Sequence, residues 1–208
     1  MAAQLEAVKW IPGTKFLVDG FRFQSSECTA YFLTHAHSDH TTGLYRSWAS
    51  GTIFCSPVTA RLITEEMGIK RAFVKVVELN KPILVRGVTV TFLDANHCPG
   101  ACMILFQVPG KCGEVQNVLH TGDFRFQPYM TEYPTLKSIQ IHTLILDTTY
   151  AAAKWRFPHQ DDVIQMMTDI MLSSRLQNPG ACRMRARACH WHVSHTFRAD
   201  GTFVMGEK

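Results

Sequence analysis

Several features that would assign a protein to a broad class are absent from this sequence. No run approaches the roughly 20 apolar residues that cross a bilayer, and residues 1–6 lack the charged-then-apolar pattern of a secretory signal. Seven cysteines, an odd number without a regular framework, favour reduced thiols over disulfides. The sequence also contains no Gly-x-Ser-x-Gly nucleophile motif and no P-loop. We therefore expect an intracellular protein that uses neither a serine elbow nor a phosphate-binding loop.

The charge of the chain carries little information about a partner. The net charge is +4 over 208 residues, but residues 179–208 hold five Lys/Arg against two acidic residues. The first 178 residues are therefore nearly neutral, and charge alone does not identify a nucleic-acid partner. The hydrophobic content of 46% is enough for a substantial core.

Metal-capable side chains are concentrated in one hexapeptide. It is His35-Ala36-His37-Ser38-Asp39-His40. An apolar strand is expected at residues 31–33, and side chains two apart at a strand end point the same way, so His35 and His37 can approach one ion. A turn would aim Asp39 and His40 at a second position nearby. Such residues also occur in surface turns, but four of them directly after a buried strand favour a zinc site.

Two further strand ends carry residues that complete such a site. His97 lies in the polar loop after an expected strand at residues 88–93, and we expect it to be the third histidine. Asp123 follows an expected strand at 115–120 and would join two ions, because a bridging carboxylate offsets the repulsion between them. His120 either supports the site from outside or is simply packed.

Two other aspartates each have two possible roles on local grounds. Asp19 follows an expected strand at residues 16–18 and either orients a ligand histidine or forms a simple Asp-Gly turn, which the local sequence favours. Asp147 follows an apolar run at 144–146 and is either functional or an ordinary cap.

The remaining pattern predicts mostly strands. We expect further strands at 52–55, 73–79, 83–85 and 103–108, with turns at Arg86-Gly87 and at residues 109–113. One helix is expected at 57–67, with Val58, Leu62, Ile63 and Met67 on one face. A second is expected at 158–176, with an apolar stripe of Val163, Met166, Met167, Ile170 and Met171. Few helices among many strands suggest a largely antiparallel sheet.

Taken in order, the polar motifs resemble those of the metallo-β-lactamase superfamily. The segments that carry this resemblance are Asp19, residues 35–40, His97 and residues 120–123. Residues 94–101, 120–125 and 146–150 resemble its β-CASP branch, and more narrowly the DNA interstrand cross-link repair nucleases. The resemblance covers roughly residues 10–178.

That resemblance implies an α/β (α+β) fold, a four-layer αββα sandwich into which a β-CASP domain is inserted late. Residues 1–150 would form the N-terminal portion of the metallo-β-lactamase-like domain and 151–180 the start of the β-CASP region. Residues 181–208 depart from the family and are expected to be a basic, disordered tail. The composition changes abruptly at Gly180, as in an alternative splice product or a frameshifted, truncated gene product.

The resemblance also implies site roles. His35, His37, His97 and Asp123 would hold the first zinc, and Asp39, His40 and Asp123 the second; Asp39, His40 and Asp123 would be the catalytic residues. Asp19 and Asp147 would act from outside the ligand shell, Asp147 matching the first acidic β-CASP motif. A hydroxide held by the metal would attack phosphorus. The family's remaining β-CASP histidines and its 5′-phosphate loop have no counterpart here, so the second site is expected to be incomplete.

The function implied is a nuclear, zinc-dependent 5′-to-3′ exodeoxyribonuclease of interstrand cross-link and double-strand break repair. Its partners would be DNA, with damaged or 5′-phosphorylated ends, and other repair proteins. Two alternatives stay open. One is an RNA-processing β-CASP endonuclease or small-molecule metallo-hydrolase, and the other is a non-catalytic fragment that binds DNA or a partner.

Overall fold

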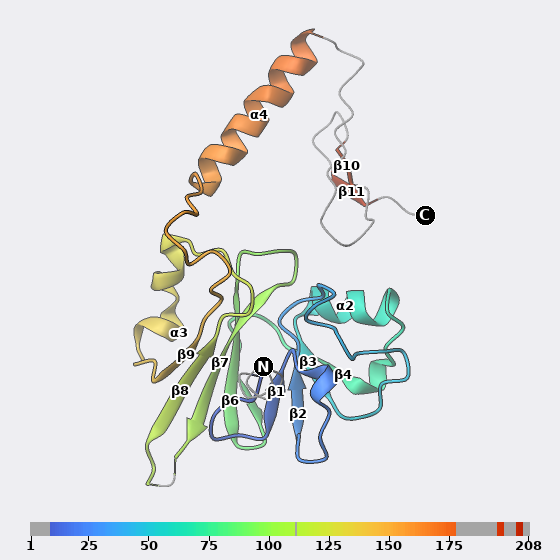
Figure 1. Ribbon diagram of the computed structural model, residues 1–208, viewed down its shortest axis with the longest axis vertical. Coiled ribbons are helices and arrows are strands. Elements are labelled where there is room, and N and C mark those ends of the chain that lie inside the picture. The colour runs from blue at the N-terminus through green and yellow to red at the C-terminus, as the bar shows by residue number, and fades with distance from the viewer. Residues whose placement is uncertain (1–8, 111, 178–194, 198–202, 206–208) are drawn as a thin grey trace. The chain divides into compact units, whose positions relative to one another are not determined.

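The structure is a computed structural model that describes residues 9–110, 112–177, 195–197 and 203–205. The chain forms two compact units, residues 1–149 and residues 150–208. Figure 1 shows their helices and strands. The metal-capable motifs all lie in the first unit.

One sheet of the first unit is entirely parallel. Its order is β1-β2-β3-β4, built from β1 (Phe16–Val18), β2 (Ala30–Phe32), β3 (Ile53–Cys55) and β4 (Val74–Val76). The prediction of a largely antiparallel arrangement is wrong for this sheet. Long connections join its strands: η1 (Phe21–Phe23) lies between β1 and β2, and α2 (Pro57–Glu65) and η2 (Arg71–Phe73) lie between β3 and β4. Such crossovers are what parallel pairing requires.

The other sheet matches the prediction closely. Its order is β5-β6-β7-β8-β9, built from β5 (Ile83–Val85), β6 (Val88–Asp94), β7 (Cys102–Pro109), β8 (Val115–His120) and β9 (Thr143–Ile145). The first three pairings are antiparallel and β8 pairs with β9 in parallel. The hairpin turn at Arg86-Gly87 is confirmed, and both residues have positive φ (48° and 85°), as a type I′ turn requires.

The two sheets pack face to face and are covered on the outside by helices (Figure 1). Alternation along β1 sends Phe16 and Val18 into the core between the sheets and Leu17 to the outer face. Ala60 and Ile63 of α2 pack on that outer face. On the far side, η3 (Pro128–Glu132) and α3 (Pro134–Lys137) cover the second sheet. The layers therefore run α, β, β, α, and the expected sandwich is confirmed.

Helix α2 is tied to the loop that carries His97. Ser56 caps the helix by accepting from Thr59 N (3.4 Å), and the Ser56 hydroxyl also donates to the Gly100 carbonyl (2.6 Å). The helix ends two residues earlier than predicted. Of the residues predicted to share one face, Ile63 is buried and Val58 is 45% exposed, because Thr59 and Ala60 are the other residues of α2 that face the sheet.

The second unit contains α4 (Gln160–Gln177), close to the predicted helix at 158–176. The predicted apolar stripe is not buried: Met166 and Ile170 are each 56% exposed. Two short strands, β10 (His195–Phe197) and β11 (Phe203–Met205), pair antiparallel. Apart from these strands, the expected disordered tail at 181–208 lies outside the described residues. None of the helices described is both long and apolar enough to cross a membrane.

Candidate metal centre

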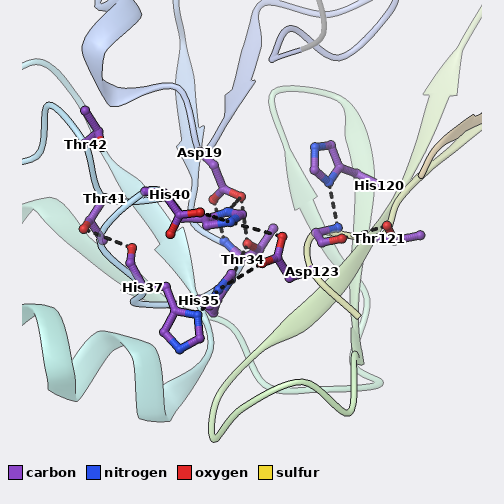
Figure 2. A network of polar contacts seen from close by, with 12 residues as sticks. Asp19, Thr34, His35, His37, His40, Thr41, Thr42, His120, Thr121 and Asp123 are labelled. Atoms are coloured by element: carbon purple, nitrogen blue, oxygen red, sulfur yellow. Dashed lines mark hydrogen bonds and ion pairs between the residues drawn. The ribbon is translucent and has the colours of Figure 1, made fainter. Parts of the chain in front are cut away.

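The strand directions explain why distant motifs meet. β1 and β2 are parallel, so Asp19 and residues 35–40 leave the first sheet at the same edge. β6 and β8 are both antiparallel to β7, so His97 and Asp123 leave the second sheet at one edge as well. The two edges adjoin, since the backbone N–H of Cys102, at the start of β7, donates to the Thr34 carbonyl (3.1 Å). Figure 2 shows Asp19, three histidines of residues 35–40 and Asp123 at this place.

Three imidazole nitrogens form the tightest group. His37 Nδ1 lies 2.9 Å from His35 Nε2 and 3.2 Å from His97 Nε2. Nitrogens bound to one tetrahedral zinc at about 2.0–2.1 Å would lie about 3.3 Å apart. The three nitrogens are therefore spaced closely enough to be ligands of a single ion.

The Asp123 carboxylate faces two groups at once. Its Oδ2 lies 3.9 Å from His35 Nε2 and 3.7 Å from His97 Nε2, whereas its Oδ1 lies 3.1 Å from His40 Nε2. His35, His40 and Asp123 also form a group with ligand-like spacing. One carboxylate oxygen thus points toward His35 and His97 and the other toward His40, which is the placement that the predicted bridging role requires.

The predicted second position is more open. Asp39 Oδ2 lies 3.5 Å from His40 Nε2, and the Asp39 side chain is 76% exposed. His40 is 12% exposed. Asp39 and Asp123, the other two residues of the predicted second set, therefore flank His40 Nε2. This position is open to solvent on the Asp39 side.

Asp19 is buried next to His40 and Thr34 (Figure 2). Its backbone has a φ of 49°, which turns the chain directly after β1. Oδ1 accepts from Thr34 N (2.9 Å), and Oδ2 accepts from the Thr34 hydroxyl (2.7 Å) and from His40 Nδ1 (2.7 Å). A simple Asp-Gly turn would not need these contacts, and they place the carboxylate where an orienting residue would lie.

These hydrogen bonds decide which ring nitrogens carry protons. A carboxylate only accepts, so the single hydroxyl proton of Thr34 is donated to Asp19. Thr34 Oγ1 must then accept from His35 Nδ1–H (3.0 Å), which leaves the lone pair of His35 Nε2 facing the cluster. Asp19 fixes His40 in the same way, because it accepts from Nδ1–H and leaves Nε2 toward Asp123.

The electrostatics balance charge within the site. Burial lowers the pKa of His40, but the hydrogen bonds with Asp123 and Asp19 outweigh it and raise that pKa to about 10. Burial raises the pKa of Asp19, whereas the hydrogen bond with His40 brings it down to about 2. Burial and the neighbouring His40 lower the pKa of His35. Without a metal, a proton on His40 compensates the two carboxylates, a role that a cation can take over.

Gly122 lets the Asp123 loop approach the histidine loop. Its φ is 55°, and a Cβ at this position would lie 2.9 Å from the Thr34 side chain. His120 supports the same turn, since its Nδ1 accepts from Gly122 N (3.0 Å). His120 is buried, and burial lowers its pKa to about 4. Its contact fits the supporting alternative rather than packing alone.

Asp147 is tied to this region through its backbone. Its N–H donates to Thr121 Oγ1 (3.0 Å), two residues before Asp123, while its own Oδ1 accepts from Thr149 N (2.9 Å). Among the described residues, the Asp147 carboxylate therefore makes a turn-capping contact, and no ligand-like group includes it.

Two residues near the site were not among the predicted site residues. The Thr34 hydroxyl donates a hydrogen bond to Asp19 and accepts one from His35. A single threonine before a histidine in the sequence does not indicate that role. Cys98 Sγ lies within 4.8 Å of the ligand atoms of His35, His37 and His97. Burial, followed by the charge of Asp123, raises the pKa of the Cys98 thiol to about 11. Its position directly after His97 was the only sequence signal.

The donor set suits a metal ion. Three imidazole nitrogens and a carboxylate are ligands that zinc and similar transition metals prefer. Hydrogen bonds hold the other ring nitrogen of His35, which belongs to this set, and of the neighbouring His40. Fold and donors together define an αββα protein with a candidate centre for one or two metal ions.

Comparison with known proteins agrees with this class. The chain is 44% identical over 172 residues to the DNA cross-link repair 1A protein of Gallus gallus, covering 82% of this chain and 17% of that protein. It is 41% identical over 141 residues to the 5′ exonuclease Apollo of Gallus gallus, covering 67% of this chain and 30% of that protein. The resemblance drawn from the motifs is confirmed: the chain is a homologue of DNA cross-link repair proteins.

Two further comparisons complete the picture. The solved metallo-β-lactamase SMB-1, bound to 2-mercaptoethanesulfonate, overlays with a TM-score of 0.40 at 15% identity, covering 62% of this chain and 63% of that one. No protein-family model matches the chain. The chain spans less than a third of the length of the two cross-link repair relatives named above.

Proposed function

We propose that this chain carries the zinc-binding part of a DNA nuclease of the 5′-to-3′ exodeoxyribonuclease type. The observation that carries the proposal is the orientation of Asp123, whose two oxygens face the histidine group and His40 separately. The names of the relatives, which include a 5′ exonuclease and cross-link repair proteins, point to DNA as the substrate. Repair of interstrand cross-links and double-strand breaks would place the protein in the nucleus.

The residues have distinct tasks in this proposal. His35, His37, His97 and Asp123 would hold the first zinc, and Asp39, His40 and Asp123 the second. When bound, the metal ions would supply Lewis-acid charge and activate water for attack on phosphorus. Asp19 keeps the His40 and His35 rings in the tautomers that a metal needs. Asp39 lies on the solvent side, from which a phosphodiester can enter.

The domain division is part of the same proposal. Residues 1–150 would be the N-terminal portion of a metallo-β-lactamase-like domain, and residues 151–180 the start of a β-CASP region. The donors predicted for the second position are Asp39, His40 and Asp123, and the Asp39 side chain among them is 76% exposed. We therefore expect the second zinc to be bound more weakly than the first.

A nuclease assay on the full chain tests the proposal. Purified protein would be incubated with zinc and 5′-phosphorylated single-stranded DNA, with the same strand carrying a 5′ hydroxyl, with matched RNA, and with a lactam. We expect stepwise loss of nucleotides from the phosphorylated DNA. Cleavage of RNA or lactam in preference to DNA would contradict the DNA assignment and support the corresponding hydrolase.

Matched variants connect activity to the site. Asp123→Asn removes the charge of the shared carboxylate and should abolish cleavage, whereas Asp169→Asn makes the same chemical change on exposed α4, where the Asp169 side chain contacts only Gln165 among the described hydrogen bonds. Unchanged cleavage by Asp123→Asn would refute the metal-centre mechanism. DNA binding without any cleavage by the unmodified chain would support a non-catalytic fragment instead.

A further inference from the structure

Three aromatic rings gather on the surface of the second unit. Tyr150, Trp155 and Phe157, here called the aromatic cluster, are 59%, 46% and 60% exposed. The Tyr150 ring centroid lies 5.5 Å from that of Trp155 and 5.0 Å from that of Phe157. Large aromatic side chains that contact one another while staying this exposed are unusual for a packing role, since burial of their area is what normally stabilises them.

The ring planes have an ordered arrangement. Trp155 and Phe157 are parallel to within 2°, with centroids 6.3 Å apart, and Tyr150 stands nearly perpendicular to both. Parallel rings two residues apart present flat faces of the same orientation. Consecutive bases of a nucleic-acid strand also present parallel faces, and aromatic rings stack on them without regard to sequence.

The Lys, Arg, Asp and Glu residues between positions 148 and 160 are all basic. Lys154 and Arg156 alternate with the aromatic residues, and the Lys154 ammonium lies 5.2 Å from the Trp155 ring centroid. No Asp or Glu occurs between residues 148 and 160. The first acidic residue after the cluster, Asp161, lies 3.6 Å from His159. Among the described residues, neither Lys154 nor Arg156 forms an ion pair, so both cations are available to an anionic partner.

We propose that the aromatic cluster binds single-stranded DNA, with bases stacking on Trp155 and Phe157 and phosphates contacting Lys154 and Arg156. An unpaired strand is favoured over a duplex because only unpaired bases offer free faces for stacking. The interleaved cations favour a polyanion over an apolar protein segment. This inference rests on the proposed function for the choice of DNA, but it concerns binding and does not involve the metal centre.

Binding of labelled oligonucleotides to the full chain tests the inference. Fluorescence anisotropy would be measured in EDTA, so that no cleavage occurs, with oligothymidine and with an abasic strand of equal length that keeps its phosphates but has no bases. We expect Trp155→Ala to weaken oligothymidine binding about tenfold, as loss of one stacking ring does. Trp155→Tyr keeps an aromatic face and should retain most of the affinity. Leu84→Ala, which truncates a 74% exposed side chain on β5, is the matched control and should bind normally.

The abasic strand and the salt dependence separate stacking from charge. Trp155→Ala should leave binding of the abasic strand unchanged, and it should leave the slope of log K against log salt unchanged. Lys154→Gln should instead reduce the magnitude of that slope by about 0.7, the value for one lost phosphate contact on a single strand. Equal losses on both strands, or no loss with Trp155→Ala, would overturn the inference.

Three further outcomes separate this inference from self-association and from the proposed function. If Trp155→Ala instead weakens self-association in sedimentation experiments and DNA binding is unaffected, a second copy of the chain covers the cluster and the inference is wrong. Metal-dependent cleavage that Asp123→Asn abolishes while Trp155→Ala leaves oligothymidine affinity intact would refute the aromatic cluster and leave the nuclease proposal standing. If Trp155→Ala weakens oligothymidine binding but the unmodified chain cleaves no DNA, the aromatic cluster is supported and the nuclease proposal is refuted.

Discussion

The substitution Asp19→Asn probes the hydrogen-bond chain that sets the histidine tautomers. Asn has nearly the same shape, and its oxygen can still accept from Thr34 N. Its amide nitrogen, however, donates where the carboxylate accepted. The Thr34 hydroxyl would then accept from Asn and turn its own proton toward His35 Nδ1, which forces the His35 proton onto Nε2. His40 would be affected directly, because its Nδ1 would also face an N–H.

The metal-facing lone pairs on Nε2 of His35 and His40 would therefore be lost, or the rings would have to change tautomer at a cost in free energy. Loss of an outer hydrogen-bond partner of a ligand typically weakens metal binding by about 10- to 100-fold, equal to about 1.4–2.7 kcal/mol. Since Asp19 acts on two histidines, we expect the upper part of this range. A similar Asp-to-Asn change in a serine protease acts through the wrong histidine tautomer while the geometry stays intact.

The assay is a zinc titration in competition with a chromophoric chelator, performed on the unmodified chain and on Asp19→Asn. Glu27→Gln serves as the control, because it removes an exposed carboxylate that pairs only with Lys15 among the described ion pairs. Circular dichroism would establish that both variants are folded. Equal zinc affinities for Asp19→Asn and the unmodified chain would refute the tautomer argument.

Three further predictions concern stability. Gly122→Ala combines a positive φ with a Cβ 2.9 Å from the Thr34 side chain, so urea unfolding should show a free energy of unfolding lower by about 1–3 kcal/mol. The loss should be larger than for Gly87→Ala, because Gly87 has a positive φ but no neighbour within 4 Å. Equal losses would contradict the close approach of Gly122 to Thr34. Phe32→Ala in the core between the sheets should cost about 3–5 kcal/mol, against less than about 0.5 kcal/mol for exposed Leu84→Ala; similar values would contradict the core assignment. Zinc at about 100 times its dissociation constant should stabilise the chain by about 2.7 kcal/mol, and chelation should reverse this in thermal unfolding; no shift would argue against binding to the folded state.

Much of the second sheet could be predicted because its strands are adjacent in the sequence. Alternating apolar residues and a two-residue turn at Arg86-Gly87 specify a hairpin locally, and β5 and β8 have the predicted bounds. The first sheet could not be predicted in the same way. Its strands are only three residues long and pair through long crossovers, so their parallel order depends on packing against α2 and against the other sheet.

The candidate site divides along similar lines. The composition of residues 35–40 alone indicates a metal site. His97 and Asp123 could be predicted as further ligands because each follows an apolar strand. The contacts of Asp19 could not be foreseen locally, since its partners Thr34 and His40 lie 15 and 21 residues away. The role of Thr34 was not visible in the sequence, because it consists of linking Asp19 to His35 through two hydrogen bonds of one hydroxyl group.

The exposed stripe of α4 shows where periodicity alone fails. Spacing of Val163, Met167 and Ile170 predicts which side of the helix is apolar, but it cannot tell whether any partner covers that side. The Ile170 side chain, for example, is 56% exposed. The amphipathic pattern therefore predicted the helix close to its observed bounds, but it did not address whether the apolar side is buried.

The central claim, that loops from two sheets bring three imidazoles and one carboxylate onto a metal ion, is tested most directly by zinc K-edge X-ray absorption on the purified chain. We expect about three nitrogen ligands at about 2.0–2.1 Å per tightly bound zinc. We also expect loss of that zinc in a His35→Ala plus His37→Ala variant and retention in His159→Ala. A chain that retains no zinc, or whose zinc signal is the same in the double variant, would contradict it.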